Sequence, residues 1–177
     1  MEKRTAKLIV GTPGGTAGNG AKTYKISLPT KWINEMNLTD NKMELYFDGK
    51  KIVITPQLSL REFVMHKKEL QHKLLLLRFY DKNDLCTEIA ADFTDKTIAV
   101  QNYTDNIIKT AFGNNKNPDW NDFEAFLADR CIPESRSGLR EYLEAIDEVK
   151  YAPLQIIQKT KGKMAEDQQW IETEEVK

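Results

Sequence analysis

The fold of the first third of this chain is decided by the stretch Thr23–Leu38, TYKISLPTKWINEMNL. Its first six residues alternate polar and apolar side chains, a pattern typical of a half-buried strand. Pro29 fixes φ at a value suited to the first turn of a helix, and Trp32, Ile33 and Met36 then fall on one helical face. We therefore predict a strand that runs directly into a short helix.

The segments on either side of this stretch complete a small β-rich unit. A strand is predicted at residues 6–10, followed by a loop at residues 11–20 that contains five glycines. Residues 43–47 and 51–54 are strand-like and are separated by an Asp-Gly pair, which is a strong hairpin signal. The predicted order over residues 1–57 is strand, loop, strand, helix, strand, strand.

Size and charge both indicate that this unit has partners. A domain of about 57 residues buries little surface alone and often relies on oligomerisation, and its strands would leave unpaired edges. Residues 1–57 carry nine Lys or Arg against five Asp or Glu, whereas residues 58–177 carry 17 against 22. We therefore expect the basic unit to form a homodimer and to bind an anionic partner.

The pattern changes near Pro56, and residues 58–177 are expected to form a second domain in which strands precede helices. Ser59 is a candidate N-cap for a first helix. The predicted strands are Leu74–Tyr80, Leu85–Phe93 and Thr97–Tyr103, and the predicted helices are Asp105–Phe112, Asp122–Arg130, Arg136–Ile146 and Pro153–Thr160. The charged end, Ile171–Lys177, is expected to be frayed. The expected fold class is α+β: a small β-rich N-terminal domain plus a mixed domain of about three strands followed by helices.

Hydropathy and cysteine usage lead us to expect a cytoplasmic protein. The longest apolar run, Leu74–Leu77, is far short of the roughly 18 residues that cross a bilayer. No apolar stretch follows Met1–Arg4, so we expect no secretory signal and no membrane association. Cys86 and Cys131 lie far apart outside any metal-binding motif, and we expect both to be reduced and buried.

The histidines give no support to a metal site or a cofactor site. His66 and His72 are the two histidines of the chain, and both are predicted on one helix. A separation of six residues does not place them on one helical face at metal-ligand spacing. We therefore expect no metal, no cofactor and no histidine-based catalytic triad.

Residues 25–54 resemble the AbrB/SpoVT/MazE family of swapped-hairpin DNA-binding domains. The resemblance rests on the strand-to-helix junction Leu28-Pro29 and on the hairpin DGKKIVI at residues 48–54, and it extends over roughly residues 5–56. It implies an intertwined homodimer whose hairpins exchange between chains and which binds duplex DNA. The residues that it assigns to DNA contact are Lys3, Arg4, Lys7, Lys22, Lys25 and Lys31.

The chain departs from the family pattern in its basic residues and its first loop. Lys22 and Lys25 stand where the family usually has an arginine, and the loop between the first two strands is longer. Lysine binds phosphate as a point charge but lacks the bidentate fork that reads guanine. The departures therefore favour phosphate contacts over readout of base sequence.

The glycine-rich loop supports binding to phosphate without the resemblance. Glycines let backbone N–H groups approach a phosphate closely, and flanking lysines neutralise its charge. The alternative is a hairpin loop with lysines that are merely solvated. Residues 15–23, GTAGNGAKT, nearly match the phosphate loop of NTPases, but Ala21 separates the glycine from the lysine and a strand follows instead of a helix, so no nucleotide hydrolysis is expected.

The second domain offers few functional signals. Arg130, Arg136 and Arg140 are expected to pair with neighbouring acidic residues at the surface, with an anion or acidic partner as the alternative. Asp92 and Asp95 have no recognisable catalytic partner, so no enzyme activity is expected. Residues 123–171 resemble a helical segment of uncharacterised bacterial proteins. The large apolar side chains in and just before this segment are expected in the core; they are Trp120, Phe123, Phe126, Leu127, Leu139, Tyr142, Leu143, Leu154, Ile157 and Trp170.

These observations favour a bacterial transcriptional regulator that binds double-stranded DNA through residues 1–57 as a homodimer. Residues 58–177 would bind an effector or a protein partner, and one form of this hypothesis is an autoregulating antitoxin whose acidic second domain neutralises a basic toxin. The alternative is a phage or mobile-element inhibitor whose second domain blocks a host enzyme.

Overall fold

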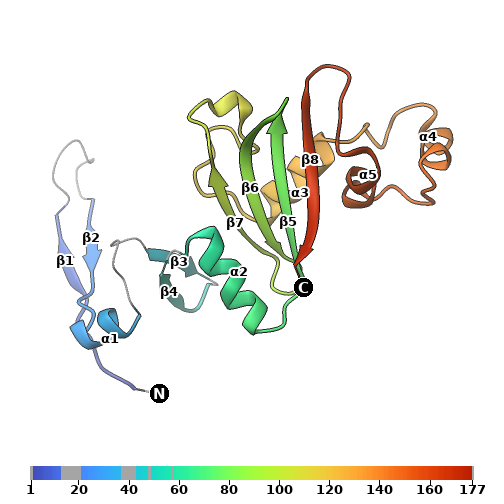
Figure 1. Cartoon of the computed structure of the whole chain (residues 1–177). Helices are drawn as coiled ribbons and strands as arrows, with labels where there is room; N and C mark the ends of the chain where they lie inside the picture. The colour runs from blue at the N-terminus through green and yellow to red at the C-terminus, as the bar shows by residue number, and fades with distance from the viewer. Residues whose placement is uncertain (1, 13–20, 37–42, 48, 57, 177) are drawn as a thin grey trace. The chain divides into compact units, whose positions relative to one another are not determined.

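The computed structural model describes residues 2–12, 21–36, 43–47, 49–56 and 58–176 (Figure 1). The chain forms two compact units, Met1–Gln57 and Leu58–Lys177, here called the N-terminal unit and the body. No helix in the described ranges is both long enough and apolar enough to span a membrane.

The N-terminal unit consists of two antiparallel hairpins and one short helix. Strand β1 (Ile9–Gly11) pairs with β2 (Thr23–Lys25), and both strands are shorter than the sequence predicts. Helix α1 (Thr30–Glu35) begins directly after Pro29, as the junction predicts. Strand β3 (Met43–Phe47) pairs with β4 (Ile52–Pro56) around the turn. The predicted glycine-rich loop lies mostly at residues 13–20, outside the described residues, as does Leu38 at the end of the predicted helix.

The body is built on one antiparallel sheet of four strands in the order β7-β6-β5-β8. The three consecutive strands are β5 (Leu74–Asp81), β6 (Asp84–Asp92) and β7 (Thr97–Asn102), and these confirm the predicted strands. The fourth, β8 (Gln169–Val176), pairs along the whole of β5. The prediction of a frayed end was therefore wrong, because Ile171 is buried in the core and anchors the segment to the sheet.

Four α-helices accompany the sheet, and two of them begin at a capping box. Helix α2 (Leu60–Glu69) has a capping box formed by Ser59 and Glu62, and α3 (Trp120–Asp129) has one formed by Asp119 and Asp122. Helices α4 (Leu139–Ala145) and α5 (Pro153–Thr160) follow. The predicted helix at 105–112 was wrong, since only a 3₁₀ turn, η1 (Ile107–Lys109), forms there.

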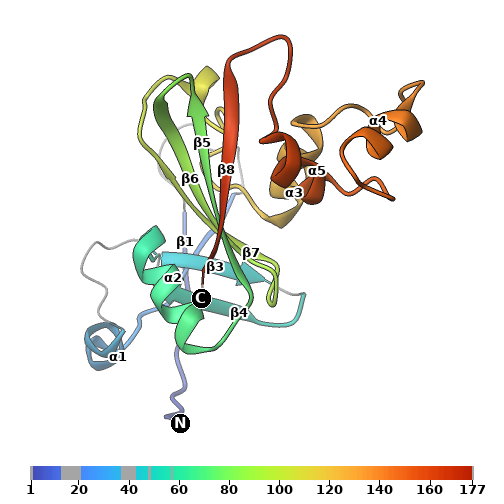
Figure 2. The ribbon, with the colours of Figure 1, turned by 45° about the vertical axis from the view of Figure 1, so that its right-hand side comes forward.

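The main core lies between one face of the sheet and helices α3 and α5 (Figure 2). Leu77, Ile89 and Ile171 of the sheet are fully buried there against Phe123 and Ile156 of the helices. Of the other predicted core residues, Trp170 is only partly buried and stacks on Tyr80 outside this cluster. Helix α2 contacts β5, β6 and β7, and its buried Phe63 is not part of the main core cluster. Both cysteines are buried and free, as predicted.

Candidate functional site

The six basic residues assigned to DNA contact are all exposed in the N-terminal unit. Lys25 lies in β2 opposite Ile9, and Lys22 immediately precedes this strand. Lys7 comes just before β1, so the first hairpin brings Lys7, Lys22 and Lys25 onto one element. Lys3 and Arg4 lie in the extended segment that leads into it.

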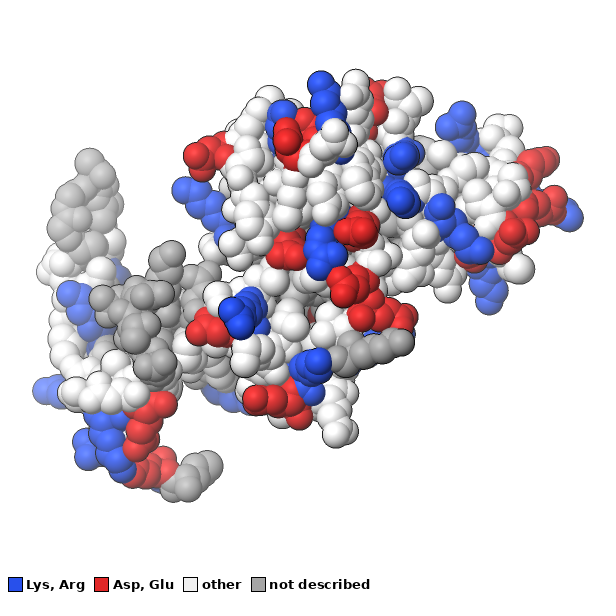
Figure 3. Space-filling view, viewed as in Figure 1, with Lys and Arg blue, Asp and Glu red and all other residues white. Residues whose placement is uncertain are grey.

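Lys31 differs from the other five because acidic side chains already surround it. Its Nζ lies 2.5 Å from Oε1 of Glu2 and 3.6 Å from Oε1 of Glu35. Glu2 also accepts a hydrogen bond from Nε1 of Trp32 at 2.8 Å. Figure 3 shows basic and acidic side chains next to one another on this unit. Lys31 is therefore the weakest candidate of the six for binding phosphate.

The N-terminal unit has no buried side chain among its described residues. Large apolar side chains are instead exposed on both hairpins, with Phe47 at 72% of its full accessible surface. On the first hairpin Leu8, Val10, Tyr24 and Ile26 are all exposed, and strand alternation places them on one face. Exposed apolar surface that is contiguous is typical of sites that bind another protein, a membrane or a ligand.

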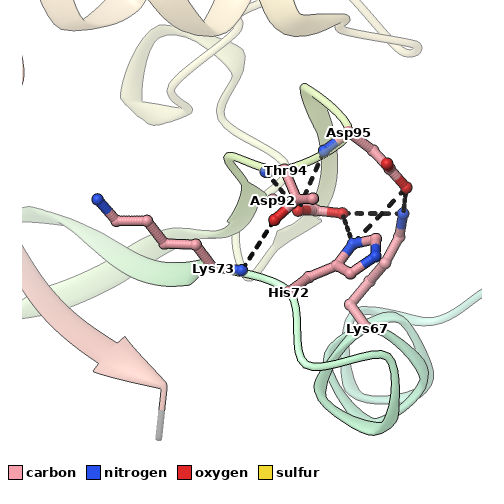
Figure 4. Close-up of polar contacts among 6 residues, drawn as sticks. All are labelled: Lys67, His72, Lys73, Asp92, Thr94 and Asp95. Carbon is pink, nitrogen blue, oxygen red and sulfur yellow. Dashed lines mark hydrogen bonds and ion pairs between the residues drawn. The ribbon is translucent and has the colours of Figure 1, made fainter.

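The body holds a cluster of charged side chains at the end of β6 (Figure 4). Asp92 ends β6 and its side chain is fully buried, with Oδ2 at 2.7 Å from Nδ1 of His72 and 2.9 Å from Nζ of Lys67. Its Oδ1 accepts hydrogen bonds from the backbone N–H groups of Thr94 and Asp95. Lys67 also lies 2.6 Å from Oδ2 of Asp95, which is about half exposed.

These contacts keep Asp92 charged. Burial alone would raise the pKa of this carboxyl, but the hydrogen bonds from His72, Lys67 and two backbone N–H groups outweigh burial and lower the pKa to about 2. The pKa of Lys67 is raised, because its bonds to Asp95 and Asp92 outweigh the effect of burial. A carboxylate with so low a pKa is poorly matched to proton transfer near neutral pH.

The same cluster has the composition of a metal site but already contains a cation. One ligand atom each from His72, Asp92 and Asp95 lies within 4.8 Å of the others. The ammonium of Lys67 lies within ion-pair distance of both carboxylates, so a metal ion would have to displace it. The geometry therefore fits an internal ion-pair network better than a metal centre.

This cluster was not predicted from the sequence. Helix α2 ends at Glu69, so His72 does not share a helix with His66 as predicted. A left-handed residue, Gln71 (φ 59°), turns the chain so that His72 reaches Asp92, which therefore has two side-chain partners, His72 and Lys67. The one available signal was the run Asp-Phe-Thr-Asp at residues 92–95, where an aspartate that ends a strand caps the following turn.

Arg130 was predicted at the surface and is instead buried. Its Nε and Nη2 donate to the carbonyl of Gly162, and Nη1 and Nη2 donate to the carboxylate of Asp167. Nη2 also donates to the carbonyl of Gln169 at 3.0 Å. The prediction holds for Arg140, which is exposed and lies 2.9 Å from Glu144. Arg130 therefore joins the end of α3 to the loop before β8 rather than binding a ligand.

The buried thiol beside Arg130 is not an activated nucleophile. Burial raises the pKa of Cys131 to about 11, although the nearby charge of Arg130 acts in the opposite direction. The thiolate is the reactive form of cysteine, and little of it exists at neutral pH with such a pKa.

Comparison of the chain with protein-family models, curated proteins and solved structures found no match.

Proposed function

We propose that this protein is a DNA-binding transcriptional regulator that binds duplex DNA as a homodimer through its N-terminal unit. The observation that supports this most is the combination of exposed basic residues on the first hairpin with exposed apolar side chains on both hairpins. Basic side chains bind the phosphate backbone, and apolar side chains bury on association with a second copy.

The homodimer accounts for the apolar surface that one chain leaves exposed. Leu45, Phe47 and Ile52 of the second hairpin are more than 60% exposed. Burial of apolar surface stabilises a protein by roughly 25 cal/mol per Å², so pairing of two such hairpins supplies the core that one unit lacks. Dimerisation would also present the basic residues of two chains to one duplex.

The proposed role of the body is to bind a protein. In the antitoxin form of the proposal the body neutralises a toxin while the N-terminal unit represses the genes of both. The body carries a net charge of −5, which favours a basic partner. We propose no enzymatic activity and no cofactor for it.

The double variant Lys22→Ala/Lys25→Ala tests the DNA-binding part. It removes two exposed charges without touching a buried group, so the unit should stay folded while affinity for duplex DNA falls and the dependence on salt becomes shallower. The matched control is Lys159→Ala/Lys163→Ala, which removes two exposed lysines of the body. Unchanged DNA affinity of the first variant would show that the assignment of these lysines is wrong.

A further inference from the structure

The outer edge of β8 is where the sheet of the body ends. β8 pairs with β5 on one side and is the last strand of the sheet. In an antiparallel ladder, successive residues direct their N–H and C=O groups alternately toward the neighbouring strand and away from it. The N–H of Ile171 donates to the carbonyl of Lys161, which lies outside the sheet, so the odd-numbered residues of β8 face outward.

Only the first half of this edge is covered. The N–H of Gln169 donates to Asp167, and its carbonyl accepts from Arg130. Farther along the strand, the outward N–H and C=O groups of Thr173 and Glu175 have no hydrogen-bond partner within residues 58–176. Unpaired groups along a strand edge are a template for pairing with another chain.

The side chains on one face of this free edge carry excess negative charge. Glu172 and Glu174 lie on the sheet face opposite the main core, and together with Glu88 they share a single arginine, Arg78. Three carboxylates against one guanidinium leave two negative charges uncompensated.

The other side of the same edge contains a cavity whose wall is partly apolar and partly polar. Lys73, Gln155 and Gln158 form the polar part of this wall. The cavity has a volume of about 290 Å³ and lies between the end of β8, the start of β5 and helix α5. Leu75, Phe93 and Leu154 form its apolar wall, and Glu175 and Val176 bring β8 to it. A strand laid along β8 would direct alternate side chains toward the glutamates and toward this cavity.

We propose that the outer edge of β8 binds an extended segment of another protein as a fifth strand. The basic side chains of the bound segment lie beside Glu172 and Glu174, and an apolar side chain on the opposite side of that segment enters the cavity. Charge argues against a second copy of β8, because antiparallel pairing of two such strands would place glutamates next to glutamates. Backbone hydrogen bonds supply the affinity and the alternating side chains supply the specificity. This inference does not depend on the proposed binding of DNA.

The test is selection of peptides from a displayed library of random decapeptides with the full-length protein. The selected peptides should alternate Lys or Arg with apolar residues. Thr173→Pro removes an outward N–H without removing a hydrogen bond to β5, and it should weaken a selected peptide by about tenfold or more. Glu172→Gln/Glu174→Gln should also weaken it, whereas the control Glu134→Gln/Glu141→Gln, on exposed residues elsewhere in the body, should not.

A second measurement keeps the test independent of the folding of Thr173→Pro. A selected peptide that is N-methylated at the amides facing β8 should lose binding to the wild-type protein, while methylation of the alternate amides should not. The proposal is wrong if no library peptide binds, or if bound peptides tolerate both Thr173→Pro and the facing methyl groups. In a third outcome, the Thr173→Pro variant forms a smaller oligomer than the wild-type protein and still binds the peptide. That result would show that the edge pairs with a second copy of the chain, and the proposal would be wrong.

Discussion

At the scale of single residues, Asp92 is the centre of the charged cluster in the body. Asp92→Asn keeps the size of the side chain but removes the charge that Lys67 and His72 face. Loss of one partner from a buried ion pair leaves the other charge poorly compensated, so we expect a loss of about 3 kcal/mol in the free energy of unfolding at pH 7. Urea denaturation of the wild-type protein and the variant would measure this loss.

The neighbouring Asp95 is the control for this change. Its side chain is 48% exposed and binds the same Lys67. Asp95→Asn should cost less than about 1 kcal/mol, as is usual for an ion pair in contact with water. Equal losses for the two variants would contradict the central position of Asp92.

The same residue predicts how stability depends on acid. The pKa of Asp92 is lowered in the folded protein to about 2 from 3.8, so its stabilising contribution is complete above about pH 4 and is lost as the pH falls toward 2. The shift corresponds to about 2 kcal/mol. The difference in unfolding free energy between wild type and Asp92→Asn should therefore shrink when urea denaturation is repeated from pH 5 down to pH 2.5. A constant difference over this range would refute the assignment.

Pairs such as His72 and Asp92 are beyond what the sequence alone can predict. The two residues are 20 positions apart, and their contact depends on the left-handed turn at Gln71 and on the register of β5 against β6. The cap at Ser59 was predictable, because its partner Glu62 lies three residues away within one motif. Contacts within one motif can be predicted from the spacing of residues, whereas contacts between elements depend on how the elements pack.

At the scale of elements, β8 shows why the prediction of a frayed end at Ile171–Lys177 was wrong. Residues 171–177 contain three glutamates and a lysine, which is the composition of a solvated tail. The strand forms because Ile171 enters the core and because Arg78 of β5 pairs with Glu172 and Glu174 across the ladder. The three consecutive strands were predictable because their turns, at 82–83 and 94–96, have strong turn compositions.

Arg130 is predicted to hold the start of β8 in place. Arg130→Lys keeps the charge but removes the planar fork that bonds Gly162, Asp167 and Gln169 together. We expect a loss of about 2 kcal/mol in the free energy of unfolding and faster hydrogen exchange in residues 167–171. Mass-spectrometric hydrogen exchange would report the local effect.

Arg140→Lys is the matched control, since Arg140 is 88% exposed and bonds only within its own helix among the described contacts. It should change stability by less than about 0.5 kcal/mol. If both variants behaved alike, the buried arginine would not be an anchor.

At the scale of the whole molecule, the fold class α+β and the expectation of a homodimer follow from the sequence, but the surface through which two chains would associate does not. In the structure, large apolar side chains of both hairpins are exposed, which the sequence does not reveal. A strand whose apolar face is buried within its own chain and a strand whose apolar face is covered only by a second chain have the same alternating pattern. The pattern shows which side chains are apolar and not what covers them.

Association of the full-length chain is therefore predicted to depend on the second hairpin. The wild-type protein should sediment at twice the 20.4 kDa of one chain, and Leu45→Ser/Phe47→Ser should sediment as a monomer or lose the fold of this unit. The control is Val149→Ser, which changes a 92% exposed apolar residue of the body and should leave the dimer intact. Analytical ultracentrifugation would decide, and a monomeric wild-type protein would contradict the homodimer.

The most direct test of the proposed function is the binding of the full-length protein to the DNA upstream of its own gene, beside an unrelated duplex, between 50 and 200 mM salt, a range over which phosphate contacts weaken strongly. We expect tight binding to the upstream DNA, a clear preference over the unrelated duplex, and a loss of affinity as salt rises. Weak binding whose affinity falls equally for both duplexes as the salt concentration rises would contradict the proposed regulator. The N-terminal unit would then be a dimerisation module alone.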